Sequence, residues 1–153
     1  MKKFASILII AIVVLTGCSS AKSGLQSKKV VFEYEAITRG SSKTVTVDEG
    51  VIKTQQALGG KQTMMSDPMD KAQWNVILAA AEKVNLDSLA TLKRPSTKSY
   101  VDAALAARLK VTVDGKEYTS AGFDHGNPPA EIKEFVKEIL KLSVIDKKVK
   151  NED

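Results

Sequence analysis

The stretch Leu105-Ala106-Ala107-Arg108-Leu109-Lys110-Val111-Thr112-Val113-Asp114-Gly115 decides the fold class of this chain. Over residues 105–113 an apolar side chain stands at every odd position, and this period of two predicts a strand with one buried face. Asp114-Gly115 predicts a two-residue hairpin turn, because type I′ turns need positive φ. The return strand is expected over residues 116–121, so the sheet is antiparallel here.

Shorter runs of the same kind occur upstream. Phe32, Tyr34 and Ala36 fall on one face of an expected strand. Turn residues follow it, and Gly59-Gly60 breaks the chain further on. These patterns predict strands over 30–37, 44–47 and 51–54, with one more short strand through 63–65.

Helical periodicity follows these strands. Asp67-Pro68 is expected to begin a helix, with Ser66 or Asp67 as its cap. Its apolar stripe includes Trp74, the one tryptophan, which is therefore expected in the core. A short helical turn over 86–92 should end before Pro95. The stripe comprises Trp74, Ile77, Leu78, Ala81 and Val84.

A second helix is expected near the end of the chain, begun by Pro128-Pro129. Charged residues occupy the face opposite its apolar stripe, which indicates a helix lying on the surface of the domain. The stripe comprises Ile132, Phe135, Val136, Ile139 and Leu140.

Composition fits one folded domain. The chain has 153 residues, 43% hydrophobic, 27% charged and 5% aromatic, which excludes a wholly disordered, fibrous or multi-span membrane protein. We expect a single globular domain over 30–145 and a polar tail over 146–153. Burial of both helix stripes predicts an α+β fold, an antiparallel sheet of about five strands with two amphipathic helices packed on one face.

The N-terminus has the features of a secretory signal. Lys2 and Lys3 precede residues 4–15, which carry no charge. As a helix this run extends roughly 18 Å, whereas a membrane span must cross about 30 Å of hydrocarbon. Residues 1–17 are therefore expected to be a cleaved signal peptide.

Leu15-Thr16-Gly17-Cys18 resembles the lipobox of bacterial lipoproteins. The resemblance implies cleavage before Cys18, transfer of a diacylglycerol to its sulfur and acylation of its new amine. Residues 18–29 would then be a lipidated cysteine and a flexible tether. Ser19 and Ser20 follow without an aspartate at the next position, and the enterobacterial sorting rule then favours the outer membrane, facing the periplasm.

Several kinds of chemistry are disfavoured. One cysteine and one histidine exclude a disulfide framework and the common zinc sites. The net charge is only +5, and removal of Lys2 and Lys3 with the signal peptide lowers it to +3. A charge of this size does not indicate a nucleic-acid-binding protein. Gly59-Gly60-Lys61 lacks the remaining positions of a phosphate-binding loop. Ser19-Ser20-Ala21-Lys22 matches a Ser-x-x-Lys pattern by chance, inside the tether. No metal or cofactor is expected.

The most suggestive candidate site surrounds His125. Asp124 is placed to orient its imidazole, Asp102 to approach from another loop, and Ser96, Thr97 and Ser99 offer hydroxyls. The same residue types also make a tight loop before a helix, and that interpretation is favoured. No catalytic residue is therefore assigned. The possible binding surface comprises Tyr100, Asp102, Asp124 and His125.

The loop over 93–100 concentrates positive charge around one aromatic residue, Tyr100. A solvated loop explains this composition, and contact with anionic lipid, glycan or a protein partner is the alternative.

The segment 101–140 resembles emfourin-type protease inhibitors. The similar features are Asp102 before a long alternating strand, the Asp114-Gly115 hairpin, Asp124 and a proline-led final helix. The resemblance implies inhibition of a metalloprotease. The whole chain also resembles small bacterial lipoproteins of unassigned function.

The leading hypothesis is a lipid-anchored envelope lipoprotein whose small, non-enzymatic domain binds a protein or glycan or takes part in envelope assembly. The alternatives are a protease-inhibitor-like domain and an envelope hydrolase that uses His125 with Asp124 or Asp102.

Overall fold

Residues 24–143 are described by the computed structural model of the chain. The predicted signal peptide, Cys18, residues 19–23 of the tether, residues 144–145 of the expected domain and the tail over 146–153 lie outside the described residues. Within the described part, no helix combines the length and apolar character that a membrane crossing requires.

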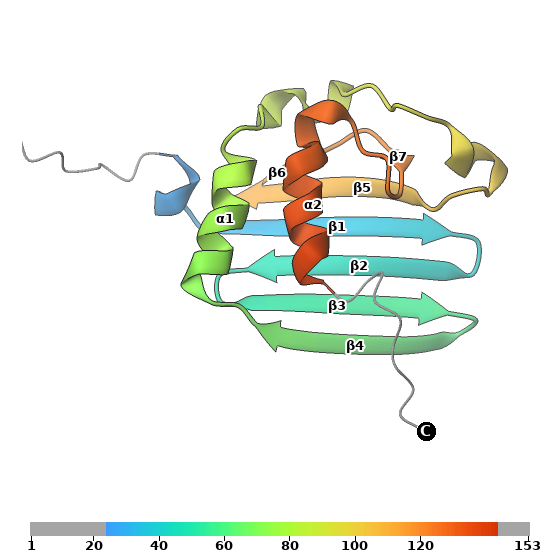
Figure 1. Cartoon of the computed structure of the whole chain (residues 1–153), viewed down its shortest axis with the longest axis horizontal. Coiled ribbons are helices and arrows are strands. Elements are labelled where there is room, and N and C mark those ends of the chain that lie inside the picture. Colours follow the sequence, from blue (N-terminus) through green and yellow to red (C-terminus); the bar gives the residue numbers. More distant parts are fainter. Residues whose placement is uncertain (1–23, 144–153) are drawn as a thin grey trace, which may run out of the picture.

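Strand β1 (Val30–Thr38) lies inside an antiparallel sheet, between β2 and β5 (Figure 1). On one side β2 (Ser41–Asp48), β3 (Val51–Leu58) and β4 (Lys61–Pro68) follow as successive hairpins. On the other side β5 (Ala106–Val113) pairs with both β6 (Lys116–Thr119) and β7 (Phe123–Asp124). The path is β4-β3-β2-β1-β5-β6.

The predicted turn at Asp114-Gly115 is confirmed, with φ of 49° and 86° at the two residues. The return strand is shorter than expected because the chain leaves β5 at Ser120. There the Ser120 hydroxyl accepts a hydrogen bond from the Leu109 N–H at 3.0 Å and donates one to the Ala121 carbonyl at 2.9 Å.

Helix α1 (Lys71–Ala81) begins later than predicted. Its cap is Asp70, whose carboxylate accepts a hydrogen bond from the Gln73 N–H at 2.8 Å, while the Gln73 side chain accepts one from the Asp70 N–H. The prediction that Ser66 or Asp67 caps this helix is wrong, because both residues belong to β4. Pro68 ends that strand at the edge of the sheet, where its missing N–H is tolerated.

The final helix, α2 (Lys133–Leu142), is preceded by a 3-10 turn over Ala130–Ile132. Pro128-Pro129 therefore leads into this turn, and the α-helix proper starts a few residues beyond the prediction.

Phe32 of β1 shows how the layers pack. Its ring centroid lies 5.6 Å from that of Trp74 in α1 and 4.9 Å from that of Phe135 in α2. Because one side chain contacts both helices, they lie on the same face of the sheet (Figure 1). Trp74 is buried there, which confirms its predicted place in the core.

The predicted α+β class and the antiparallel sheet are confirmed, but the details differ. The sheet has seven strands in place of about five, since residues 55–66 extend the β3–β4 hairpin and residues 123–124 add a short strand. The covering layer is also more than two helices: a 3-10 segment over Leu86–Thr91 inserts Leu89, which is fully buried.

Candidate functional site

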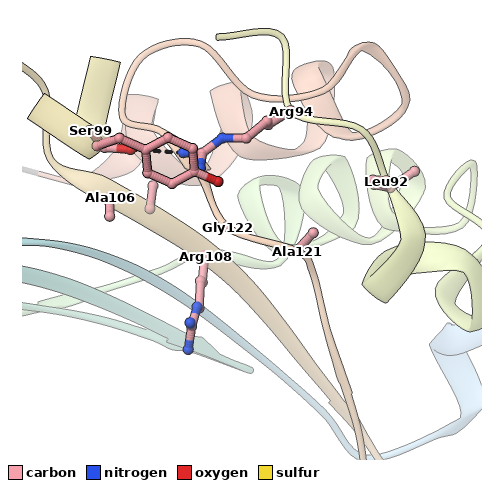
Figure 2. Close-up of a pocket in the computed structure, with 9 residues that line it drawn as sticks. Leu92, Arg94, Ser99, Ala106, Arg108, Ala121 and Gly122 are labelled. Atoms are coloured by element: carbon pink, nitrogen blue, oxygen red, sulfur yellow. Dashed lines mark hydrogen bonds between the residues drawn. The ribbon is translucent and has the colours of Figure 1, made fainter. Parts of the chain in front are cut away.

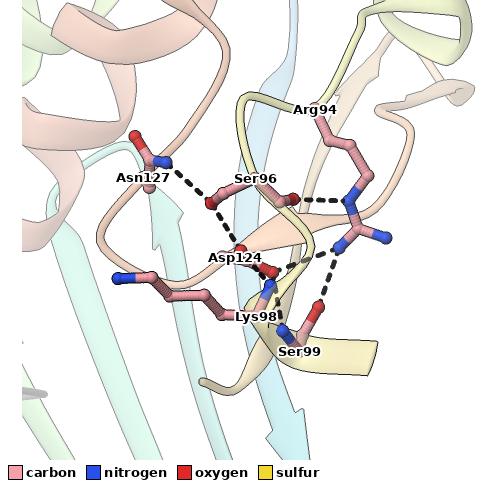
Figure 3. A network of polar contacts seen from close by, with 6 residues as sticks. All are labelled: Arg94, Ser96, Lys98, Ser99, Asp124 and Asn127. Atoms are coloured by element: carbon pink, nitrogen blue, oxygen red, sulfur yellow. Dashed lines mark hydrogen bonds and ion pairs between the residues drawn. The ribbon is translucent and has the colours of Figure 1, made fainter. Parts of the chain in front are cut away.

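A buried carboxylate organises the one long loop that precedes β5. Asp124, on β7, has only 1% of its surface exposed. It accepts hydrogen bonds from the backbone N–H groups of Lys98 at 2.8 Å and Ser99 at 2.9 Å, and from the Ser96 hydroxyl (Figure 3). Nη2 of Arg94 lies 3.2 Å from Oδ1 of the same carboxylate, the oxygen that also accepts from the Ser99 N–H. Asp124 thus fixes the loop to the sheet.

Arg94 closes the loop from its own side. Its Nε donates to the Ser96 carbonyl at 3.0 Å, and its Nη2 donates to the Ser99 hydroxyl at 2.7 Å. The Asn127 amide adds a bond to the Ser96 hydroxyl at 2.8 Å (Figure 3). Among the described residues, no buried side-chain nitrogen or oxygen lacks a hydrogen-bond partner, and a satisfied network of this kind makes the loop base rigid.

The pKa of Asp124 reflects two opposing effects. Burial by itself raises the pKa of a carboxyl group, because it disfavours the charged form. Hydrogen bonds from Ser96, Ser99 and the backbone N–H of Lys98 outweigh burial and hold the pKa of Asp124 well below its usual value. Asp124 therefore remains an acceptor at neutral pH and is no proton donor.

On this base the loop presents a 3-10 turn, Lys98–Val101, to solvent. Tyr100 is 72% exposed and Val101 is 77% exposed. The Arg94 guanidinium lies 4.0 Å from the Tyr100 ring centroid, so the aromatic ring is held from below by a cation–π contact. Asp102 ends the turn in the left-handed conformation, with φ of 54°, and is exposed.

A cavity of about 390 Å³ lies beside this loop. It opens between the loop and β5, beside Ala121 and Gly122, where the chain passes from β6 to β7. Arg94 stands on its loop side, and the Arg108 side chain extends away from Arg94 (Figure 2). Tyr100 also lines the cavity. The remaining lining is small and mostly apolar: Leu92, Ser99, Ala106, Ala107, Ala121 and Gly122.

His125 takes a different direction from Asp124. Its Nδ1 lies 2.7 Å from the hydroxyl of Tyr34, and the two ring centroids are 5.8 Å apart. Tyr34 is fully buried in β1, and His125 is half-buried over it. The imidazole is thereby packed on the core sheet, away from the Tyr100 tip of the loop.

The structure therefore separates the predicted binding residues. Tyr100 and Asp102 lie together at the exposed end of the loop, and Asp124 lies beneath it. His125 contacts Tyr34, and the Ser96 and Ser99 hydroxyls belong to the network of Asp124 and Arg94. A base-activated hydroxyl needs the base within hydrogen-bond reach. The hydroxyl bonded to His125 is that of Tyr34, which is fully buried, whereas the predicted hydroxyls of Ser96 and Ser99 bond to Asp124 and Arg94. The sequence reasoning did not identify Arg94 or Tyr34 as partners of these residues.

Among residues 24–143, no three His, Cys, Asp or Glu side chains come together in a group able to hold a metal ion. Comparisons of the chain with protein-family models, with curated proteins and with solved structures gave no match.

Proposed function

We propose that this chain is a lipid-anchored envelope protein whose domain binds a protein or glycan partner through the recognition loop, residues 94–102, without catalysing a reaction. The observation that carries this proposal is the pairing of an exposed tip, Tyr100 and Val101, with a base fixed by the buried Asp124.

The energetics of association favour such a loop as a binding element. Ordering a loop opposes binding, so a loop that is already held in place loses less conformational freedom when a partner arrives. Tyrosine is enriched among the residues that dominate binding energy. Val101 is exposed to water in the free domain, so the burial of its apolar side chain against a partner would favour binding.

The anchor rests on the lipobox-like residues 15–18. Lipid on Cys18 would hold the domain close to the membrane, because the N–H of Leu25 already donates to the Glu82 carboxylate at 3.1 Å and that of Lys29 to the Asp114 carboxylate at 3.0 Å. The part of the tether before Gly24 would span roughly 18 Å when fully extended. The sorting rule favours the outer membrane, with the domain facing the periplasm. Two or more acyl chains suffice for stable membrane binding.

Site-specific photo-crosslinking in whole cells tests the binding surface. A photoreactive residue replaces Val101 in one strain and Val76 in a control strain, since Val76 of α1 is also exposed, at 51%, but lies outside the loop. We expect a discrete crosslinked species with the probe at 101 and none at 76. The added change Tyr100→Ala should reduce that species several-fold.

Equal crosslinking at both positions would contradict the proposal. So would turnover of an envelope substrate by the purified chain that is lost in His125→Ala while folding is retained, because that result identifies a hydrolase.

A protease-inhibitor-like function is the second candidate. It is favoured by the rigid base under exposed residues 100–101, since a segment that enters a protease cleft must resist rearrangement. Addition of the purified chain to envelope proteases of the same cells should then lower their activity. The inhibition should be lost with Val101→Asp and retained with Val76→Asp.

A further inference from the structure

Strand β4 is the outer edge of the sheet on the side away from the recognition loop (Figure 1). Each of its residues, Lys61–Pro68, is exposed. Within the part of the chain that the structure describes, no strand lies on its outer side. β4 therefore offers an unpaired hydrogen-bonding edge.

The register fixes which backbone groups point outward. In an antiparallel ladder, every second residue directs its N–H and C=O toward the same neighbour. The Gly59-Gly60 turn makes Leu58 and Lys61 the hydrogen-bonded closing pair. Just beyond the other end of the strand, the Met69 N–H donates to the Gly50 carbonyl at 2.9 Å. Residue 69 therefore directs its backbone groups to the same side as residue 61. Odd-numbered residues of β4 thus face β3. The outward residues are Gln62, Met64 and Ser66.

Proteins usually protect such an edge with charge, proline or a bulge. In β4 these devices occur only at the ends, as Lys61, Asp67 and Pro68. Pairing with β3 continues without a bulge along the whole strand. The middle of β4 is uncharged, and Met64 is 68% exposed.

We propose that β4 pairs with β4 of a second copy of this chain, in antiparallel orientation and centred on Met64. A two-fold axis perpendicular to the sheet would then keep the helix-covered faces of both copies on the same side. Gln62 would lie opposite Ser66 of the second copy, and the outward N–H and C=O groups of these residues would complete a ladder across the axis.

Charge identifies the occupant as a second copy. Lys61 and Asp67 stand at equal distances from Met64 along the strand, so antiparallel self-pairing centred there places each lysine opposite an aspartate. If the two strands were shifted by two residues in either direction, neither lysine would lie opposite an aspartate. Exposed ion pairs contribute little affinity, but they set register and exclude wrong partners.

Cysteine crosslinking in native membranes tests the register with the full chain. In the hydrogen-bonded pair at the axis the two Cα atoms would be about 5.5 Å apart, within the range for a disulfide. Under mild oxidation, Met64→Cys should give a disulfide-linked dimer. Gln62→Cys and Ser66→Cys alone should stay at the level of the parent, whose one cysteine is Cys18. When the Gln62→Cys chain and the Ser66→Cys chain are expressed together in one cell, they should form a disulfide-linked dimer.

A second variant tests the backbone hydrogen bonds. Met64→Pro removes an outward N–H and leaves the ladder to β3 intact. Added to both cysteine chains, it should lower the 62–66 crosslink at least about ten-fold, as the loss of two hydrogen bonds implies. Met64→Ala keeps the N–H and should retain the crosslink.

Equal crosslinking at 62, 64 and 66, or none above the parent at 64, would overturn the proposal. If Met64→Pro does not fold, charge reversal decides: Lys61→Asp should weaken the 62–66 crosslink, and Lys61→Asp with Asp67→Lys should restore it. A lack of restoration would also overturn it. None of these outcomes depends on the recognition loop, so the two proposals fail separately.

Discussion

The guanidinium of Arg94 lies 3.2 Å from the carboxylate of Asp124, and the two residues are 30 positions apart in the chain. This ion pair joins the start of the recognition loop to β7 at the sheet. Because Asp124 is buried and its oxygens already accept several hydrogen bonds, its role is to position the loop. The exposed tip at Tyr100 depends on this buried base.

Replacement of Asp124 by asparagine should destabilise the domain. The substitution leaves the partly buried Arg94 without its counter-charge and cannot satisfy all the donors of the loop base. We expect the midpoint of thermal unfolding to fall by at least about 5 °C, with faster proteolysis within the loop. Asp102→Asn is the matched control, since Asp102 is exposed and asparagine tolerates the left-handed conformation. Equal midpoints for the two variants would contradict this role.

Acid should weaken the domain through the same carboxylate. Asp124 holds its proton less tightly in the folded state than in the unfolded chain, because its folded pKa lies below the ordinary aspartate value of about 3.9. Its contribution to the free energy of unfolding is therefore complete above that pH and is lost as pH falls through the lowered pKa. Between pH 6 and pH 2, the free energy of unfolding measured with urea should fall less for Asp124→Asn than for the parent chain. Parallel curves would refute the assignment.

The contact between Tyr34 and His125 should be structural. A double-mutant cycle with Tyr34→Phe and His125→Ala is expected to give a coupling of about 1 kcal/mol in the free energy of unfolding, the usual range for one hydrogen bond. Tyr100→Phe is the control for the tyrosine change, since it should show no coupling to His125. The absence of coupling between Tyr34 and His125 would show that their contact does not stabilise the domain.

The start of α1 gives a test of its cap. Asp70→Ala should lower the free energy of unfolding by about 1 kcal/mol, because it removes the acceptor for the first turn. Asp67→Ala changes an exposed strand residue and should stay within about 0.5 kcal/mol. Denaturant unfolding distinguishes the two variants. A larger effect at Asp67 than at Asp70 would contradict Asp70 as the cap and favour Asp67, as predicted from the sequence.

Local patterns predicted the parts of the fold that local physics decides. The period of two in residues 105–113 and the turn at Asp114-Gly115 need only neighbouring residues, and both agree with the structure. The same holds for four members of the apolar stripe, Trp74, Ile77, Leu78 and Ala81, which are buried in α1. The fifth member, Val84, lies beyond the end of the helix and is only partly buried.

The edge of the sheet and the helix start were harder to predict. β4 is exposed on both faces, so burial imposes no alternation on it, and its polar residues look like a loop. Asp67-Pro68 then resembles a helix start, although Asp70 supplies the cap.

The site was predicted only in part, because its contacts are distant in sequence. Asp124 was expected to orient the adjacent His125, but Asp124 ends β7 and His125 begins the turn that the Asn127 N–H closes on the Asp124 carbonyl at 2.9 Å. Each finds a partner far away, Arg94 for Asp124 and Tyr34 for His125, and no spacing in the sequence indicates either pair.

The proposed location depends on the proposed lipid anchor at Cys18, and intact mass spectrometry of the native chain tests that anchor most directly. The chain should be recovered from membranes, begin at Cys18 and carry the added mass of a diacylglycerol and an N-linked acyl group. A chain recovered from the soluble extract with residues 1–17 still present and no added mass would contradict the proposed lipoprotein.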